Sequence, residues 1–411
     1  MAESVSSPSA ATAAARGGFL AAIFLMATSA IGPGFITQTA TFTAKLGSAF
    51  AFAIAASIVI DFVVQLNIWR ITALTRRNAS DTANAAIPGA GYLLAVLVLI
   101  GGLAFNVGNI AGAGLGLNAM FGLDPKIGGA ASAFLAIAIF MSRRAGLLLD
   151  RAIIGLGVLM IGMTLVVAFT TNPPVGEALR QIVMPDVIDF ATITTIVGGT
   201  VGGYITYSGA HRLLDKGLVG EENLAAVTRA SLTGIAVTGV MRFVLFLAIL
   251  GVVASGVTLD LSGQAANPAA QAFAHALGEG GMRIFGVILW AAAITSVIGA
   301  AYTSVSFLTV FTTLDERTRG IATVIFIFFS LLVYVVMGTA PAAILVFVGG
   351  FNGLILPIGL SIFTYVGFAR PDLMGGHRYN RPLLIASAVV CALTWYMGWK
   401  SVGTIFAFLN A

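Results

Sequence analysis

Two short stretches of helix-breaking residues interrupt apolar segments of this 411-residue chain. Residues 32–37 read GPGFIT, and residues 202–206 read GGYIT. A break inside a helix frees N–H groups at the start of one half and carbonyl groups at the end of the other. Such groups are costly in lipid, so a broken spanning helix is tolerated where the break lines a cavity or packs on protein. Free helix ends can bind ions and polar solutes. The alternative is a kink that serves packing alone.

The segments that would hold these breaks are membrane-spanning helices. The chain is 58% hydrophobic and 9% charged, whereas a soluble domain carries about 25% charged residues. Its apolar segments reach the ~20 residues that a spanning helix needs and lack the alternating pattern of a membrane β-barrel. We therefore predict an all-α integral membrane protein. The eleven predicted spans cover residues 17–46 (interrupted), 48–72, 90–117, 127–142, 145–171, 188–216 (interrupted), 224–255, 282–311, 319–338, 341–368 and 383–409.

The two breaks fall in the first and sixth predicted spans, which divides the chain into two repeats of five spans. An odd number of spans makes such repeats inverted in the membrane, and paired breaks at matching positions indicate a solute site. We predict a first repeat at 17–171, a second repeat at 188–368 and an additional span at 383–409. Residues 1–16 are predicted to be a disordered cytoplasmic N-terminus, with no signal peptide.

The distribution of basic residues predicts the orientation. Most of the 21 Lys and Arg residues fall on one side when the N-terminus is placed in the cytoplasm. By the positive-inside rule we expect a multi-pass protein of the plasma (inner) membrane, with the N-terminus cytoplasmic and the C-terminus outside. The expected partners are the lipid bilayer, a small-molecule solute and, as an open option, protons. No nucleic-acid patch is present, and the sequence does not predict an oligomeric state.

Few residues inside the predicted spans can carry charge or bind a metal. Cys391 is the only cysteine, which excludes an internal disulfide and a cysteine metal cluster. The three histidines, among them His211, are expected in or beside loops. Asp61 lies in mid-span and is a candidate for proton coupling. The alternative is a packing role, with Arg242 as its counter-ion. Arg242 is otherwise a clamp for a solute carboxylate or a side chain that snorkels to the membrane surface.

The sequence resembles the NRAMP family of divalent-metal transporters over about its first ten spans. The likeness rests on the two interrupted spans, on GLNAMFGLDP at 116–125 and on FNGLILP at 351–357. It implies a leucine-transporter-type fold of two inverted five-helix repeats, with the first and sixth helices unwound in mid-span. In that family the first span carries Asp-Pro-Gly-Asn and the sixth carries Met-Pro-His. The Asp, Asn and Met bind a transition metal, while the His and acids of the third span help to move protons.

This chain keeps the breakers of the family and lacks its ligands. Gly32 and Phe35 stand at the family's Asp and Asn positions. The matching positions of the sixth and third spans carry Gly202, Gly203 and Tyr204, and Asn106 and Asn109. A divalent or transition-metal ion requires charged or soft ligands, which these side chains do not provide. We therefore predict no metal site.

The first two spans are similar to those of one branch of the family, on MATSAIGPGFITQTATFT at 26–43 and IVIDFVVQLNIWR at 58–70. That branch is often encoded beside 5-oxoprolinase components, so the resemblance implies uptake of 5-oxoproline or a related small carboxylate or amide. We predict a secondary transporter of a small organic solute, with proton coupling left open. The alternatives are a proton symporter of manganese, iron or magnesium, and a non-transporting sensor or scaffold.

The candidate site combines both breaks with polar residues of the third and tenth spans. A solute carboxylate is expected at the free start of the helix after the first break, a ring against the aromatic residues, and an amide on the asparagines. No cofactor is expected, and no enzyme activity, because no nucleophile stands beside a base. The predicted substrate-binding residues are Gly32, Gly34, Phe35, Thr37, Gln38, Gly202, Gly203, Tyr204, Asn106, Asn109 and Asn352.

Overall fold

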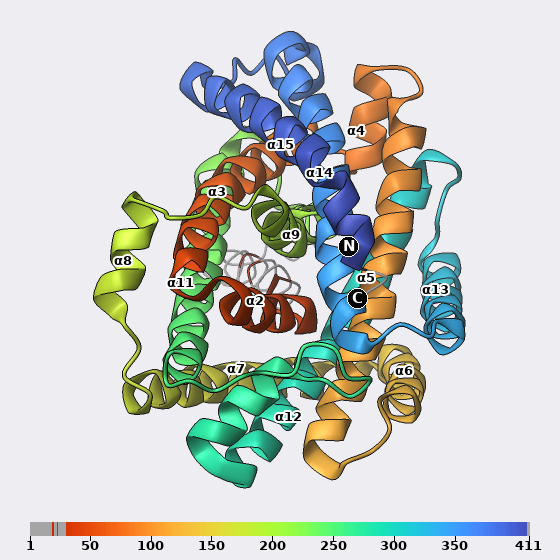
Figure 1. Ribbon diagram of the computed structural model, residues 1–411. Helices are drawn as coiled ribbons and strands as arrows, with labels where there is room; N and C mark the ends of the chain where they lie inside the picture. The colour runs from red at the N-terminus through yellow and green to blue at the C-terminus, as the bar shows by residue number, and fades with distance from the viewer. Residues whose placement is uncertain (1–18, 20–22, 24–29, 409–411) are drawn as a thin grey trace, which may run out of the picture.

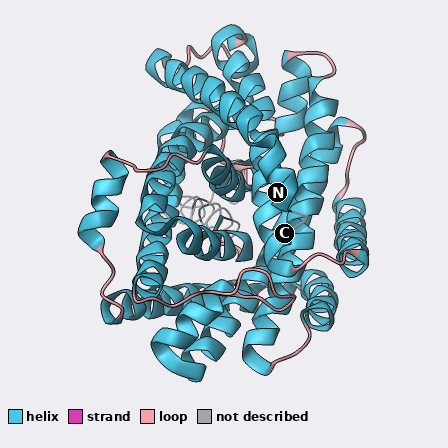
Figure 2. Cartoon of the chain, viewed as in Figure 1, coloured by secondary structure: helices cyan, strands magenta, loops and turns pink. Residues whose placement is uncertain are grey.

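The computed structural model describes residues 19, 23 and 30–408, and only the backbone of residues 143–154. The described residues are largely helical and contain no strand (Figure 2). The elements are α2 (Pro33–Leu46), η1 (Gly47–Ala49), α3 (Phe50–Thr75), α4 (Ala79–Ala86), α5 (Ala90–Phe121), α6 (Pro125–Met141), α7 (Arg143–Thr170), α8 (Val175–Val183), α9 (Phe190–Val201), α10 (Ile205–Asp215), η2 (Glu221–Asn223), α11 (Leu224–Ala254), α12 (Pro268–Ser306), η3 (Phe307–Val310), α13 (Glu316–Val336), α14 (Pro341–Ala369), η4 (Pro371–Met374) and α15 (Arg381–Ala407).

The chain is a multi-pass membrane protein. Seven helical stretches of the described part are long and apolar enough to cross a membrane, or eight if residues 155–170 of α7 and the sharply bent α8 form one span. The predicted count of eleven spans stays a prediction. The predicted count exceeds the seven or eight stretches for two reasons. The halves of a broken helix and the 17-residue α6 are each shorter than a full span, and α2 and α3 run on as one stretch.

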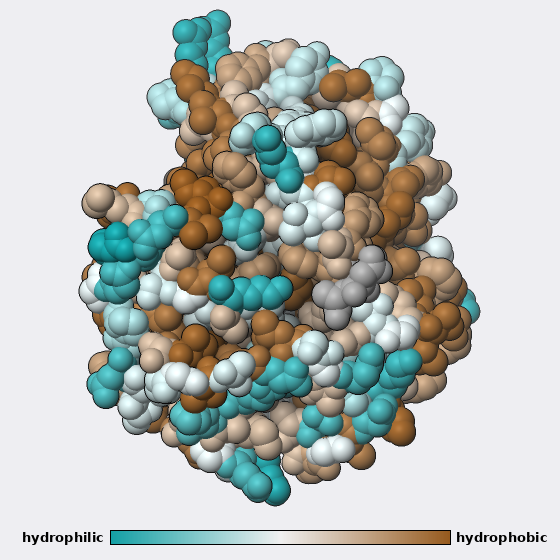
Figure 3. All heavy atoms as spheres, in the orientation of Figure 1, coloured by the Kyte–Doolittle hydropathy of each residue, from teal (hydrophilic) through white to brown (hydrophobic). Residues whose placement is uncertain are grey.

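The surface agrees with a lipid environment. Many large apolar side chains are exposed, among them Phe169, Val336 and Trp399. In the space-filling view, hydrophobic residues cover much of the upper and right edges, while hydrophilic residues gather on the face toward the viewer (Figure 3). Contiguous exposed apolar surface is rare on a soluble monomer and common on a surface that faces lipid.

Two short helices lie in the middle of the bundle. In Figure 1, α2 and α9 occupy the centre, with α3 and α11 on one side and α5 and α14 on the other. Helix α2 packs against α5, α9, α11, α12 and α14, and α9 packs against α3, α14 and α15. The contact of α9 with α14 is close because both helices present glycine: a Cβ on Gly198 would lie 2.7 Å from the Cα of Gly353.

Helix starts are marked by side chains that accept backbone N–H groups. Asp124 accepts from Lys126 and Ile127 at the start of α6. Asn267, Asp315 and Asn380 act in the same way at α12, α13 and α15. These caps satisfy donors that a helix cannot pair internally, so the sequence itself fixes where these helices begin.

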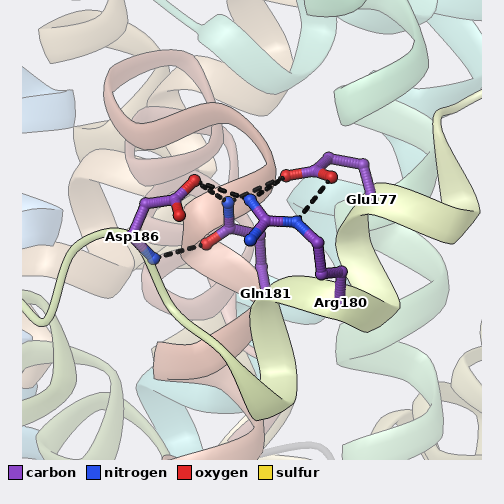
Figure 4. Close-up of polar contacts among 4 residues, drawn as sticks. All are labelled: Glu177, Arg180, Gln181 and Asp186. Carbon is purple, nitrogen blue, oxygen red and sulfur yellow. Dashed lines mark hydrogen bonds and ion pairs between the residues drawn. The ribbon is translucent and has the colours of Figure 1, made fainter.

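A polar cluster ties α8 to the segment that leads into α9 (Figure 4). The guanidinium of Arg180 donates to Glu177 at 2.7 and 2.9 Å and to Asp186 at 2.8 Å. Gln181 donates to both carboxylates and accepts from the Asp186 N–H at 2.8 Å. Helix α8 lies outside the predicted spans, and hydrogen bonds from Arg180 lower the pKa of Glu177 to about 2 and also lower the pKa of Asp186. The cluster therefore connects α8 to the segment that precedes α9.

Candidate functional site

The predicted break of the sixth span is confirmed. Helix α9 ends at Val201 and α10 begins at Ile205. Between them Gly202 is extended, with φ −78° and ψ 166°, and Gly203 has φ 54°. Glycine is required at 203 because this φ is left-handed and because a Cβ there would approach the Asn352 side chain and the Phe105 ring.

The break of the first span is confirmed at its second half. Gly32 is extended, with φ −71° and ψ 178°, and Pro33 is the first residue of α2. Most of the first half, within residues 17–29, lies outside the described residues, as does the predicted disordered segment 1–16. No side chain of the described residues caps α2, so the N–H groups of Gly34 and Phe35 in its first turn have no partner inside the helix. Pro33 packs on Gly112 of α5, where a Cβ would lie 2.6 Å from the proline Cγ.

Two buried amide side chains connect the breaks through α14. Gln38 of α2 donates to the carbonyl of Leu345 at 2.8 Å. A Cβ on Gly199 of α9 would lie 3.1 Å from the Gln38 amide carbon, so this side chain also touches α9. Asn352 donates to the Val348 carbonyl of its own helix at 2.9 Å and to the Gly101 carbonyl of α5 at 3.2 Å. Its oxygen faces Gly203 at the second break.

Several buried polar atoms around the breaks have no hydrogen-bond partner in the described part of the chain. Native proteins pair nearly all such atoms, so a group of unpaired ones needs an explanation. A solute that completes these bonds is one explanation that the arrangement allows. The atoms on α2 and α14 are Thr37 Oγ1, Gln38 Oε1 and Asn352 Oδ1, with Thr39 Oγ1 beside them. Asn106 Oδ1 and Asn109 Nδ2 of α5 are also unpaired.

Three further candidate residues lie at the breaks themselves. Gly34 lies in the first turn of α2, where its Cβ would be 3.6 Å from the Gln38 amide nitrogen. Phe35 is buried in the same turn. Tyr204 is buried at the second break and packs edge-on against Phe105, with ring centroids 5.3 Å apart.

The two asparagines of α5 are also predicted site residues. Asn106 donates to Ser330 of α13 at 3.3 Å, away from the residues around the breaks. Asn109 is 4% exposed on the same helix, one turn closer to its end. Their assignment to the site therefore stays a prediction.

A fully buried ion pair lies beside both breaks. Asp61 of α3 and Arg242 of α11 are joined by a contact of 2.9 Å between Oδ2 and Nη2. Arg242 also donates to Ser57, and Thr200 donates to Asp61 at 2.9 Å. The sequence indicates Asp61 and Arg242 as a candidate pair, but it does not identify Ser57 or Thr200 as their partners. Ser57 stands one helical turn before Asp61, a spacing that signals contact on one helix face.

His211 was expected in or beside a loop, and this prediction was wrong. The residue lies inside α10 and is buried, because α10 begins only after the break and runs on to Asp215. Its Nε2 accepts from the Ala79 N–H at 3.1 Å, and its Nδ1 bonds Ser306 at 2.8 Å. His211 thereby caps α4 and ties it to α10 and α12. No signal in the sequence pairs residues 79 and 211.

The described residues contain no group of three or more His, Cys, Asp or Glu side chains that could hold a metal ion. Around the breaks, neutral amides, hydroxyls and backbone groups supply the polarity. Asp61 is the acid near them, and it is already paired with Arg242. The arrangement is suited to hydrogen-bonding a polar solute.

Helices α2 and α10, each of which begins directly after a break inside a helical membrane bundle, are typical of the leucine-transporter-type fold. The solved structures that share this fold include a manganese transporter of Eremococcus coleocola, with a TM-score of 0.73, 15% identity and coverage of 99% of this chain and 89% of that one. MhsT in complex with L-phenylalanine superposes with a TM-score of 0.68, 16% identity and coverage of 93% and 98%.

The chain belongs to the Nramp family, described as natural resistance-associated macrophage protein-like, whose model matches residues 23–402. An uncharacterized membrane protein of Haemophilus influenzae is 51% identical over 371 residues, 90% of this chain and 91% of its own length. The uncharacterized membrane protein YcsG of Bacillus subtilis is 49% identical over 380 residues, 92% of each chain. The resemblance noted in the sequence is therefore confirmed as membership.

Proposed function

We propose that this Nramp-family protein is a secondary transporter of a small organic carboxylate or amide, which binds between the two helix breaks. The observation that carries the proposal is the chemistry of the residues there. Both breaks are retained, while Gly32, Phe35 and Tyr204 replace the metal-binding and proton-moving residues that the resemblance implies. The site therefore offers helix ends and neutral hydrogen-bonding groups to the solute.

The geometry supports a role for each part of such a solute. N–H groups in the first turn of α2 attract a carboxylate, because the helix dipole is positive there. The unpaired oxygens of Gln38 and Asn352 accept from an amide N–H. The rings of Phe35 and Tyr204 provide apolar surface at the two breaks. A small cyclic molecule with an amide and a carboxylate, such as 5-oxoproline, matches all three features.

A divalent-cation symporter is the second candidate. It is favoured by the fold shared with a manganese transporter and by the unpaired oxygens of Gln38, Asn106 and Asn352. Neutral oxygens alone are poor compensation for removing a doubly charged ion from water. We therefore rank it below the organic solute.

The two candidates are separated by transport into proteoliposomes. Under an inward proton gradient we expect uptake of labelled 5-oxoproline and no uptake of manganese. Gly203→Ala should abolish uptake, because a side chain at 203 disturbs the break. Gly403→Ala is the matched control, since Gly403 is exposed on α15 and a Cβ there meets no atom within 4 Å. Manganese uptake that is lost in Gly203→Ala would contradict the proposal.

The repeat boundaries and the orientation belong to the same proposal. We infer two inverted repeats at 17–171 and 188–368, an additional helix at 383–409, a cytoplasmic N-terminus and a C-terminus outside. The support is the matching position of the breaks before α2 and α10. Labelling of single cysteines placed at residues 78 and 264, in a Cys391→Ser background, tests the orientation. The predicted inside site should react only after the membrane is permeabilised.

A further inference from the structure

Asp61 and Arg242 form a charge pair with bonding capacity left over. Both side chains are fully buried, and one oxygen of Asp61, Oδ2, accepts from Arg242 and from Thr200. Among the residues that the structure describes, the other oxygen, Oδ1, and the Nε–H of Arg242 have no partner. A buried ion pair is stabilising only when its remaining donors and acceptors are also bonded. This pair is therefore incomplete as a purely structural element.

The pair is joined to both helix breaks. The guanidinium carbon of Arg242 lies 5.7 Å from the centroid of the Phe35 ring, in the first turn of α2. Thr200, which donates to Asp61, stands two residues before Gly202, where α9 unwinds. A solute held between the breaks thus has the cationic member of the pair beside one break and the anionic member bonded beside the other.

Among the described residues, no other charged group forms an ion pair with Asp61 or Arg242. Helices α9 and α14 carry no Asp, Glu, Lys, Arg or His, and α2 carries only Lys45, in its last turn. The titratable residues of the elements packed on α3, other than the pair, are Lys45, Asp81, Glu177, Arg180, Tyr207, His211, Arg212, Asp215, Glu221, Glu222, Arg229, Tyr365, Asp372, Arg381, Cys391, Tyr396 and Lys400, with Tyr204 at the break.

The net charge of the Asp61–Arg242 pair then limits how an anion can bind beside it. The resting pair has a net charge of zero, and a bound carboxylate would make it −1. An uncompensated charge in a low-dielectric interior is costly, and taking up one proton removes it. Asp61 is the carboxylate placed to accept that proton, on an oxygen that has no partner.

We propose that Asp61 and Arg242 couple the entry of one carboxylate to the uptake of one proton. In the resting state the Asp61 carboxylate pairs with the Arg242 guanidinium. On binding, the proton adds to Asp61 and the guanidinium pairs with the solute carboxylate, so the buried charge is zero before and after. Release of the solute returns the proton and restores the pair. This inference rests on the proposed function and assigns its coupling ion and the acidic class of its solute.

Binding at different pH values tests the exchange. The carboxyl of 5-oxoproline, with a pKa near 3.5, stays ionised between about pH 6 and pH 8. We expect the dissociation constant, measured by calorimetry on the detergent-solubilised full chain, to rise about tenfold per pH unit over this interval, because one proton is bound with the solute. The neutral analogue 5-oxoprolinamide should show no such slope.

Variants separate the two roles. Asp61→Asn should bind 5-oxoproline without pH dependence, because asparagine resembles the protonated acid. Arg242→Gln should weaken 5-oxoproline binding about 10- to 100-fold, the worth of a charged hydrogen bond, and leave the amide analogue unaffected. The double variant Asp61→Asn/Arg242→Gln keeps the centre neutral and covers the case in which a single variant does not fold. It should still bind the neutral amide and bind the acid more weakly than the wild type does, because nothing compensates the charge of the carboxylate. Asp260→Asn and Arg283→Gln, both on the surface, are the matched controls.

Transport gives an independent readout. Uptake of 5-oxoproline into proteoliposomes should follow an imposed pH gradient and ignore a potassium-diffusion potential, because one negative and one positive charge move together. Uptake driven by the potential, or a pH slope that survives in Asp61→Asn, would overturn the coupling while leaving the organic-solute transporter intact. If the wild-type chain neither binds nor transports 5-oxoproline, lactate or other small carboxylates, the proposed function itself is refuted.

Discussion

Gly203 offers the sharpest test of the broken sixth helix. Its φ of 54° is left-handed, and a residue with a side chain pays about 1–2 kcal/mol to adopt that conformation. An added Cβ would also lie 2.9 Å from the Asn352 side-chain carbon and 3.3 Å from the Phe105 ring, with the Asn352 oxygen closer still. Overpacking of this kind costs about 1–3 kcal/mol. Gly203→Ala should therefore destabilise the folded protein by about 2–5 kcal/mol.

The assay is thermal unfolding in detergent, followed by the fluorescence of the four tryptophans. We expect a clearly lower Tm for Gly203→Ala than for the wild type, together with loss of 5-oxoproline binding. Gly403→Ala removes a glycine from an exposed position of α15, and it should keep or slightly raise the Tm, since alanine is the better helix former. An unchanged Tm in Gly203→Ala would show that α9 and α10 are joined by ordinary helix, and the reasoning about the site would fail with it.

Three further predictions concern the parts that hold the site in place. His211→Ala leaves the Ala79 N–H without its partner and should cost about 1–3 kcal/mol in unfolding free energy; an unaltered Tm would contradict the capping role. Gly198→Ala should force α9 away from α14 and lower the Tm, at a cost of about 1–3 kcal/mol in unfolding free energy. An unchanged Tm would show that the two helices do not pack closely at this point. Arg180→Gln should lower the Tm near pH 7. Because Arg180 lowers the pKa of Glu177 from 4.5 to about 2, its stabilisation is complete above about pH 4.5 and is lost as the pH falls toward 2. The Tm difference from wild type should shrink over that interval, and a constant difference would argue against the ion pair.

The folding class and the two breaks could be predicted because they depend on local chemistry. Long apolar segments need no partner to identify them as spans, and glycine and proline end a helix wherever they occur. Both breaks accordingly begin within a residue of the predicted positions, at Gly32 and at Gly202. The count of spans was harder to predict, because a helix that is broken or bent no longer meets the length of a single crossing.

The contacts between breaks could not be predicted in the same way. Gln38 and Leu345 are 307 residues apart and Asp61 and Arg242 are 181 apart. A single sequence carries no signal for such distances. His211 shows the limit most clearly, because its position near the end of a predicted span suggested a loop, and only the packing of α10 against α4 showed that it is buried.

By itself the sequence determined that this protein is a helical membrane protein with two matched breaks and no ionised metal ligands at them. These properties follow from residue types and from their order along the chain. Tertiary structure alone decided that Gln38 of α2 bonds α14, that Asn352 of α14 bonds α5, and that Asp61 meets Arg242. The physical reason is that side-chain pairing depends on how helices cross, and the crossings are set by packing of the whole bundle around closely spaced glycines such as Gly198.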